Sequence, residues 1–263
     1  NKDICLQLYD SIAEQTNATF PEFMYQAFHT TPELGAIIKG GRELVASKGL
    51  FITKKRYAVL IYDLENKRLD TEGKTGKVKA MGLDLKRSDT PKLVQDFLAD
   101  ILKKTLDGVD QDAIVEEIRE FKYTFKNLPS WEKGTPKRVN KLTYYGELER
   151  REGHANMPGH VRAALNWNRM RKMHGDTRSI EIVDGMKTIV CKLKDNPLGY
   201  TSIGYPTDEI RIPNWFKEMP FDSDEMEDTI VSQKVENLLG VLDWDITNKT
   251  NISNTFTTLF EFD

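Results

Sequence analysis

The chain has few residues of the kinds that form reactive centres or cross-links. Its 263 residues include only 2 cysteines, Cys5 and Cys191, and 4 histidines. The cysteines form neither a metal-ligand spacing nor a disulfide framework, which favours a reducing, cytoplasmic setting. No histidine lies in a nucleophile motif, and the sequence has neither a Walker loop nor a dinucleotide-binding glycine motif. Nucleophilic catalysis and phosphate binding by such loops therefore have no candidate site.

Long apolar runs are also missing. The longest, such as YAVLIY at 57–62, are far shorter than a membrane span, and no signal peptide opens the chain. The first residue is Asn rather than Met, so we expect a processed product or an excised piece. With 30% charged and 39% hydrophobic residues, the composition is typical of a soluble globular protein without a membrane partner.

The charges are segregated along the sequence, although the net charge is only −3. Residues 1–50 carry 4 cations and 6 anions, residues 51–172 carry 26 and 18, and residues 173–263 carry 8 and 17. A basic middle segment can attract a polyanion whatever the net charge, because local potential steers association. Charge blocks are also common on ordinary solvated surfaces, and on charge alone that interpretation is the better one.

The acidic clusters do not predict a metal site. The densest are FDSDEMED at 221–228 and DWD at 243–245. Metal-dependent phosphoryl transfer needs carboxylates that converge on the ions, and neither cluster follows a predicted strand. Because charge runs usually solvate, we interpret 221–228 as a loop before a helix and expect no metal ligand in this chain.

Hydrophobic periodicity predicts an α+β fold with segregated parts: helices and a small antiparallel sheet, then a mostly helical half with a β-hairpin. Residues 2–28 read as two helices, or as one interrupted at Pro21. The clearest strand is RYAVLIYD at 56–63, with short strands at 43–47 and 50–53 before it and a return strand at 78–85. A boundary near residue 80 is expected.

The second half has four helix signals and one hairpin signal. Ser88 to Pro91 reads as a helix start, and Leu93 and Phe97 as part of the apolar face that follows. Residues 128–159 are predicted to be irregular and basic. The expected helices span 92–106, 111–125, 160–173 and 227–245, and the hairpin spans 185–206.

The segment FITKKRYAVLIYD at 51–63 places three consecutive cations, Lys54, Lys55 and Arg56, directly before Tyr57. Lysine and arginine contact phosphates, and their long stems can enter a minor groove. Tyr57 can press against a sugar or a base edge while the following strand anchors it. A strand start with solvated charges explains this composition equally well.

Further cationic clusters lie in the basic middle segment. LKRSDTPK at 85–92 combines cations with a helix start, and the N–H groups of a helix N-terminus bind anions. The alternative is an ordinary N-cap, which Ser88 or Asp89 can supply alone. Two more clusters follow at 134–142 and 160–169. The side chains concerned are Lys86, Arg87, Ser88, Thr90, Lys92, Lys137, Arg138, Asn140, Lys141, His160 and Arg162.

These segments resemble family B DNA polymerases, in particular the replicative polymerases of large tailed bacteriophages. GLFITKKRYAVLIYD at 49–63 is similar to the family's K-K-R-Y segment, and GLDLKRSDTPK at 82–92 to its passage from palm to thumb. PGHVRAALNWN at 158–168 and NPLGYTSIGYP at 196–206 resemble later thumb segments. The tail TFTTLFEFD at 255–263 resembles the peptide that holds a sliding clamp. The order is right, and the resemblance covers essentially the whole chain.

The resemblance implies a DNA-directed DNA polymerase, a nucleotidyltransferase of DNA replication that uses Mg²⁺. The family holds its metal ions mainly with palm aspartates in a Y-G-D-T-D-S motif, which is absent here, as are the fingers and exonuclease parts. Residues 1–80 would then end the palm, 81–250 form the thumb and 251–263 bind the clamp. We expect the chain alone to be inactive. It would be an excised piece or the second product of a split gene, in the host-cell cytoplasm if phage-encoded.

The resemblance also implies roles for single residues. Lys54, Lys55, Arg56 and Tyr57 match the segment that lies against the primer–template minor groove near the primer terminus. Glu43 matches an acidic palm position, although Gly41 stands where the phage pattern often has Asp. The implied DNA-backbone contacts are Lys86, Arg87, Ser88, Thr90, Arg138 and Arg162, and the implied clamp contacts are Leu259, Phe260 and Phe262.

The implied partners are primer–template DNA, the N-terminal exonuclease, fingers and palm portion, and a sliding clamp. Two other interpretations stay open. The chain could be a stand-alone nucleic-acid-binding replication accessory module without polymerase activity, or a structural protein with a polarised surface.

Overall fold

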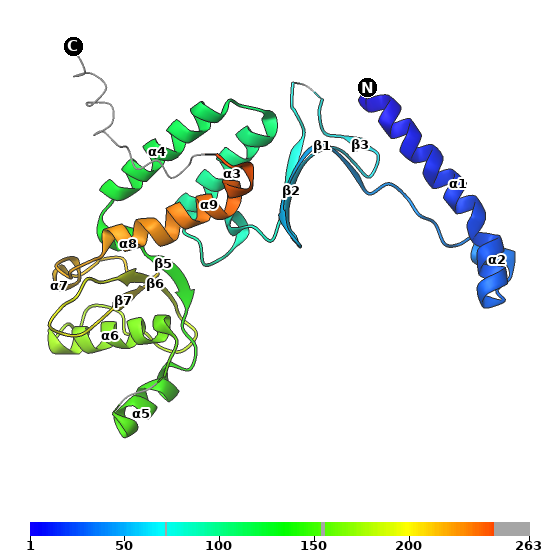
Figure 1. Cartoon of the computed structure of the whole chain (residues 1–263). Coiled ribbons are helices and arrows are strands. Elements are labelled where there is room, and N and C mark those ends of the chain that lie inside the picture. The colour runs from blue at the N-terminus through cyan, green and yellow to red at the C-terminus, as the bar shows by residue number, and fades with distance from the viewer. Residues whose placement is uncertain (72, 154–155, 245–263) are drawn as a thin grey trace, which may run out of the picture. The chain divides into compact units, whose positions relative to one another are not determined.

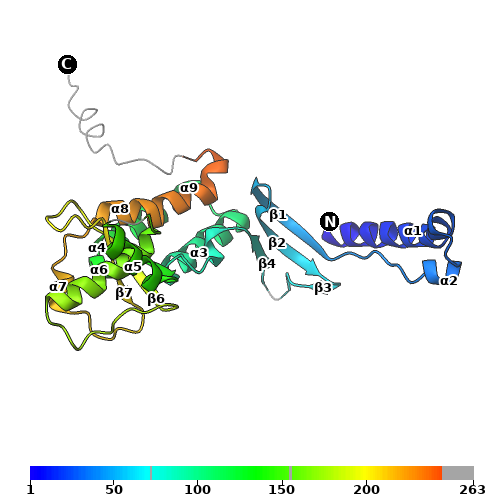
Figure 2. The same cartoon turned by 90° about the horizontal axis from the view of Figure 1, so that it is seen from below.

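The computed structural model describes residues 1–71, 73–153 and 156–244. The chain divides into two compact units, Asn1–Gly82 and Leu83–Asp263. Each unit combines helices with one small antiparallel sheet (Figures 1 and 2), so the predicted α+β class is confirmed. No helix in the described ranges is long and apolar enough to cross a membrane.

The sheet of the first unit is organised on strand β2 (Arg56–Leu64), which is the strand predicted most clearly. One side of β2 pairs with β1 (Leu44–Thr53), and the other pairs with β4 (Lys77–Met81) and the short β3 (Lys67–Arg68). Every residue of β2 from Ala58 to Asp63 is buried, as its β-branched and aromatic composition suggests. The two short strands predicted before it are one strand, in which irregular pairing interrupts the register.

Helix α1 (Lys2–Phe28) is continuous through Pro21, so the predicted break is wrong. Proline has no backbone N–H, so the carbonyl of Asn17, four residues earlier, lacks its usual helical donor. Here the side-chain amide of Asn17 donates to the carbonyl of Gly40 at 2.9 Å and accepts from its N–H at 2.7 Å. A short helix, α2 (Pro32–Gly35), follows.

In the second unit, helices α3 (Lys92–Asp107) and α4 (Gln111–Asn127) pack on each other where the periodicity predicted them. The rings of Phe97 and Phe121 stack between them with centroids 3.7 Å apart. Leu93, expected on the buried face of α3, is exposed, and Val94 and Leu98 are buried instead. The helix therefore presents a face rotated slightly from the predicted one.

The sheet of the second unit has three antiparallel strands in the order β5-β6-β7. The predicted hairpin corresponds to β6 (Lys187–Lys192) and β7 (Ser202–Pro206), and β5 (Thr135–Arg138) extends it. Helix α6 (Gly159–Met173) packs against β6 and β7. Its fully buried Trp167 lies among aromatic rings and donates to the carbonyl of Ile180 at 2.9 Å.

Two predictions for this half are wrong. Residues 128–159 are not irregular, because they contain β5 and helix α5 (Leu142–Glu152). The acidic segment 221–228 is not only a loop, since α8 (Ser223–Glu227) starts within it and continues through a π-turn, η3 (Asp228–Ser232), into α9 (Gln233–Leu239). The remaining short elements are η1 (Asp84–Lys86), η2 (Ser130–Lys133), α7 (Asn214–Lys217) and η4 (Gly240–Leu242).

Candidate nucleic-acid interface

In the first unit, the predicted cations form the tip of the β1–β2 hairpin. Thr53 pairs with Arg56, so Lys54 and Lys55 are the two residues of the turn. Both lysines are exposed, and neither has an ion-pair partner in the part of the chain that the structure describes. Arg56 is half-buried at the start of β2. The turn therefore presents two solvated cations, and the strand that follows it, β2, is buried.

The backbone at this tip is fixed. Lys55 has a φ of 64°, in the left-handed region that side chains other than glycine rarely adopt. Gly82 also has a positive φ, 65°, and a Cβ there would lie 2.4 Å from the carbonyl oxygen of Lys55. Only glycine fits so close to another backbone. The segment after β4 thus lies against the tip and holds it.

Tyr57, the aromatic residue of the motif, stacks on Phe51 across the hairpin. Their ring centroids are 5.9 Å apart, with 25° between the ring planes. Cross-strand aromatic pairs of this kind stabilise a hairpin by roughly 0.2–1 kcal/mol. The stack places Tyr57 against Phe51, close to the turn lysines.

Glu43 lies in no acidic cluster of the described residues. Its side chain is 72% exposed and pairs with Lys79 Nζ at 3.1 Å. Among the described residues, no group of three or more His, Cys, Asp or Glu side chains could hold a metal ion. The described residues therefore do not fit a Mg²⁺ site, and Glu43 is an ion-pair partner of Lys79 in this structure.

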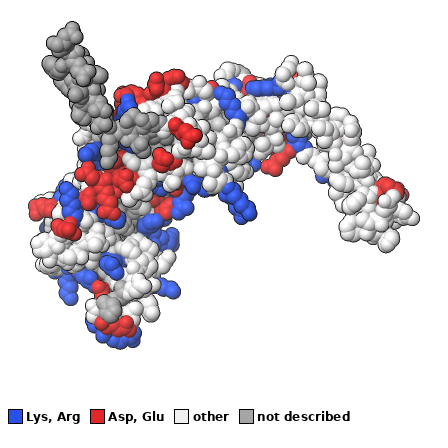
Figure 3. Space-filling model, viewed as in Figure 1, with Lys and Arg blue, Asp and Glu red and all other residues white. Residues whose placement is uncertain are grey.

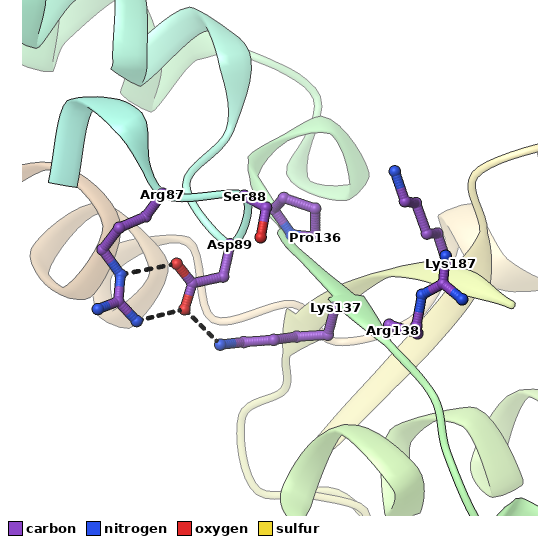
Figure 4. A pocket seen from close by; sticks show the side chains of 7 residues that line it. All are labelled: Arg87, Ser88, Asp89, Pro136, Lys137, Arg138 and Lys187. Atoms are coloured by element: carbon purple, nitrogen blue, oxygen red, sulfur yellow. Dashed lines mark hydrogen bonds and ion pairs between the residues drawn. The ribbon is translucent and has the colours of Figure 1, made fainter. Parts of the chain in front are cut away.

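In the second unit, a basic pocket of about 430 Å³ lies where the 87–89 segment faces strands β5 and β6. Figure 4 shows its lining side chains, which come from segments far apart in the sequence. On the face of this unit seen in Figure 3, Lys and Arg atoms gather near β5, whereas Asp and Glu atoms gather near α8. The pocket is lined by Arg87, Ser88, Asp89, Pro136, Lys137, Arg138 and Lys187.

Asp89 connects two cations on one side of this pocket. Arg87 donates to both of its carboxylate oxygens at 3.0 Å, and Lys137 Nζ donates at 2.9 Å. The bonds from Arg87, and then that from Lys137, hold the pKa of Asp89 well below its usual range. Ser88 and Asp89 were predicted as possible N-caps of α3, which is wrong: Pro91 is the N-cap, and no side chain of the described residues caps this helix.

The other side of the pocket carries cations without a carboxylate. Arg138 and Lys187 are directly opposite each other in the β5–β6 register, and both are exposed. No ion pair of either is found in the described ranges. In Figure 4 they lie on the side of the pocket away from Asp89, so that side can accept an anion. Sequence reasoning missed Lys187, because its closeness to Arg138 depends on strand pairing.

The remaining predicted residues of this unit occupy different environments. Ser88 lines the pocket and Lys86 is exposed, whereas Thr90 is buried and its hydroxyl accepts from Lys234 Nζ at 3.1 Å. Thr90 therefore has no surface to offer to a DNA backbone. Arg162 is exposed on α6. Near the start of the same helix, burial and then the Lys137 charge lower the pKa of His160.

The sequence of the chain is similar to those of known proteins. No family model matches the chain. It is 28% identical over 162 residues to the DNA-directed DNA polymerase of Enterobacteria phage T4, and 30% identical over 160 residues to that of Escherichia phage RB69. Each match covers 60% of this chain. The chain is related to phage DNA polymerases.

The matched stretch spans 17% of each of these polymerases, so the chain corresponds to a small share of its relatives. In this polymerase-related chain, the structure brings the predicted Lys54, Lys55 and Tyr57 together in the first unit. It brings Arg87, Ser88 and Arg138 together in the second unit. The predicted clamp contacts Leu259, Phe260 and Phe262 lie outside the described residues.

Proposed function

We propose that the chain is the palm–thumb part of a phage-type DNA polymerase and that it holds the primer–template duplex near the primer terminus. The observation that carries this proposal is the exposed pair Lys54 and Lys55, at the turn of the β1–β2 hairpin in a chain related to phage DNA polymerases. Two lysines without an ion-pair partner among the described residues are suited to bind phosphates, which dominate the affinity of proteins for DNA. Arg56 and Tyr57 complete the contact at the minor groove.

In this proposal, residues 1–80 belong to the palm and residues 81–250 to the thumb. The thumb contacts the sugar–phosphate backbone through the basic pocket, where Arg138 and Lys187 lack acidic partners in the described part of the chain. Lys86, Arg87, Ser88 and Arg162 border or extend this surface. Such contacts position a duplex without reading its sequence, as a replicative polymerase requires.

The proposal includes a polypeptide partner, the N-terminal exonuclease, fingers and palm portion of the polymerase. The relatives are about six times longer than the matched stretch, which is 17% of each. Helix α1 supports the idea, because none of its residues is buried and Ile4, Leu8 and Phe23 are exposed. Large exposed apolar surfaces commonly mark protein interfaces. We place the Mg²⁺ ions and the catalytic aspartates in that partner, so the chain alone adds no nucleotides.

We further propose that the C-terminal tail docks a sliding clamp through Leu259, Phe260 and Phe262. This part of the proposal rests on the resemblance of 255–263 to a clamp-binding peptide. Aromatic and leucine side chains are frequent anchors in peptide recognition.

Primer extension by the chain together with the upstream polymerase portion tests the proposed function. Extension should require both polypeptides, and Lys55→Ala should lower it at limiting DNA. Lys39→Ala is the matched control, because Lys39 is also an exposed cation of the first unit without an ion pair among the described residues. Tight duplex binding without extension when both polypeptides are present would support the stand-alone accessory module instead.

A further inference from the structure

Three side chains form an apolar row across the sheet of the first unit. Phe51 is paired with Tyr57 in the β1–β2 register, and Tyr57 is paired with Met81 in the β2–β4 register. Residues directly opposite in a sheet project from the same face. Phe51 is 68% exposed and Met81 is 46% exposed. The row therefore presents apolar surface to solvent right beside the hairpin tip.

The Phe51 ring lies close to two neighbours. It stacks on Tyr57, and it also covers the backbone of Gly49. A Cβ at Gly49 would lie 2.8 Å from Cε2 of Phe51, closer than such atoms approach. Because Gly49 has no side chain, the ring of Phe51 can lie close to the strand. Most of the Phe51 side chain nevertheless remains in contact with water.

Cations border this row on both sides. Lys54 and Lys55 lie beyond it at the tip. Lys79 and Lys77 lie on the same face of β4, two and four residues before Met81, and Lys79 shares its charge with Glu43 at 3.1 Å. A strand rises about 3.3 Å per residue, so Lys79 stands about 7 Å along the strand from the row.

This order of cation, apolar row and cation is complementary to the minor groove of a nucleic-acid duplex. Two phosphate backbones border a groove about 6 Å wide, and sugars and base edges lie between them. Charge complementarity favours this occupant over a protein segment, which would need acidic residues on both sides of an apolar stripe. Apolar side chains are known to enter minor grooves.

We propose that Phe51 and Met81 extend Tyr57 into one contact row that lies against the sugar and base edges of the duplex minor groove. The lysines on either side contact the phosphates. This inference rests on the proposed function, because it specifies what the hairpin face touches. Burial of the row removes apolar surface from water, so its contribution to affinity does not depend on salt.

The test is a titration of a fluorescently labelled primer–template duplex with the full chain, followed by anisotropy at several salt concentrations. Phe51→Ala and Met81→Ser should each weaken binding by about 5- to 20-fold. The slope of log affinity against log salt should stay as in the unaltered chain. Lys55→Ala, in contrast, should make that slope about 0.9 less steep, because one phosphate contact is lost.

Two further variants separate contact from folding. Phe51→Leu keeps an apolar side chain and should bind within about 2-fold of the unaltered chain, since most of the buried area is retained. Tyr123→Ala removes an exposed aromatic side chain of α4 and should change nothing. Thermal melting of each variant shows whether it is folded. Met81→Ser should disturb folding less than Phe51→Ala, because Met81 is exposed and does not stack on Tyr57.

The outcomes separate the inference from the proposed function. Normal binding by Phe51→Ala and Met81→Ser, together with weak binding by Lys55→Ala, overturns the apolar row and leaves the proposed function standing. Normal binding by all three variants overturns both. A loss with Phe51→Ala or Met81→Ser that comes with a reduced salt slope also overturns the row, because it shows lost phosphate contacts.

Discussion

Arg138 and Lys187 face each other directly across strands β5 and β6. Like charges in opposite positions of a sheet destabilise it, typically by several tenths of a kcal/mol. Neither residue has a carboxylate partner in the ranges that the structure describes. A phosphate placed between them would offset the repulsion, so the pair is suited to hold a phosphate and has a small cost to the free protein.

Lys187→Gln should therefore stabilise the free chain and weaken its binding to DNA. Relief of the repulsion should raise the free energy of unfolding by about 0.2–1 kcal/mol. Loss of one phosphate contact should reduce the salt slope of duplex binding by about 0.9. Urea unfolding and anisotropy measure the two effects. Lys172→Gln, which changes an exposed cation of α6, should leave both quantities unchanged. A less stable Lys187→Gln chain with normal DNA affinity contradicts the assignment.

Gly82→Ala should displace the tip of the β1–β2 hairpin. The new Cβ would lie 2.4 Å from the carbonyl oxygen of Lys55, and φ at this position is 65°. A left-handed conformation costs an alanine roughly 1–2 kcal/mol, and the clash adds to it. Duplex affinity should fall because the lysines of the tip move.

Gly73→Ala is the matched control for that variant. Gly73 also has a positive φ, 78°, but a Cβ there would meet nothing within 4 Å. The control should lose stability from backbone strain alone and keep its affinity for DNA. Equal loss of affinity in the two variants would show that Gly82 has no specific relation to the tip.

The ion pairs of Asp89 should make the stability of the second unit depend on pH. Its pKa is lowered in the folded chain, so the carboxylate stabilises the fold fully at pH 7. That contribution should begin to disappear as the pH falls below about 4, where the unfolded chain binds a proton, and should be lost through the lower folded pKa.

Urea unfolding of the unaltered chain and of Asp89→Asn measures this dependence. The difference in free energy of unfolding should be largest near pH 7 and should shrink towards pH 3. Asp96→Asn, which breaks an exposed pair with Lys92, should show a much smaller difference. A difference for Asp89→Asn that grows on acidification contradicts the assignment.

Removal of residues 256–263 should reduce processive synthesis by the assembled polymerase only when a sliding clamp is present. Single-turnover primer extension with and without clamp measures the effect. An equal loss in both conditions would sink the docking proposal, because it would show that the tail supports the polymerase itself.

Local sequence pattern predicted the elements whose signals are local. The β-branched run in β2 and the apolar periodicity of α3 and α4 specify those elements without help from distant residues. Strand β5 was missed because Thr135–Arg138 contains a proline and two cations. Only its pairing with β6 makes it a strand, and such pairing is not visible in a local window.

In the candidate site, too, only the features that depend on neighbouring residues in the sequence were predictable. Lys54, Lys55 and Tyr57 lie together because they are adjacent in the sequence. The pairing of Arg138 with Lys187 and the burial of Thr90 follow from tertiary packing. Phe51 and Met81 carried no sequence signal at all, since an exposed apolar residue is unremarkable until its neighbours across the sheet are known.

The salt dependence of duplex binding by the double variant Lys54→Ala/Lys55→Ala tests the central claim most directly. If both lysines contact phosphates, the slope of log affinity against log salt should become about 1.8 less steep, and affinity at low salt should fall accordingly. Lys39→Ala should leave the slope unchanged. A double variant that binds the duplex with the affinity and slope of the unaltered chain would contradict the claim that this hairpin holds the DNA.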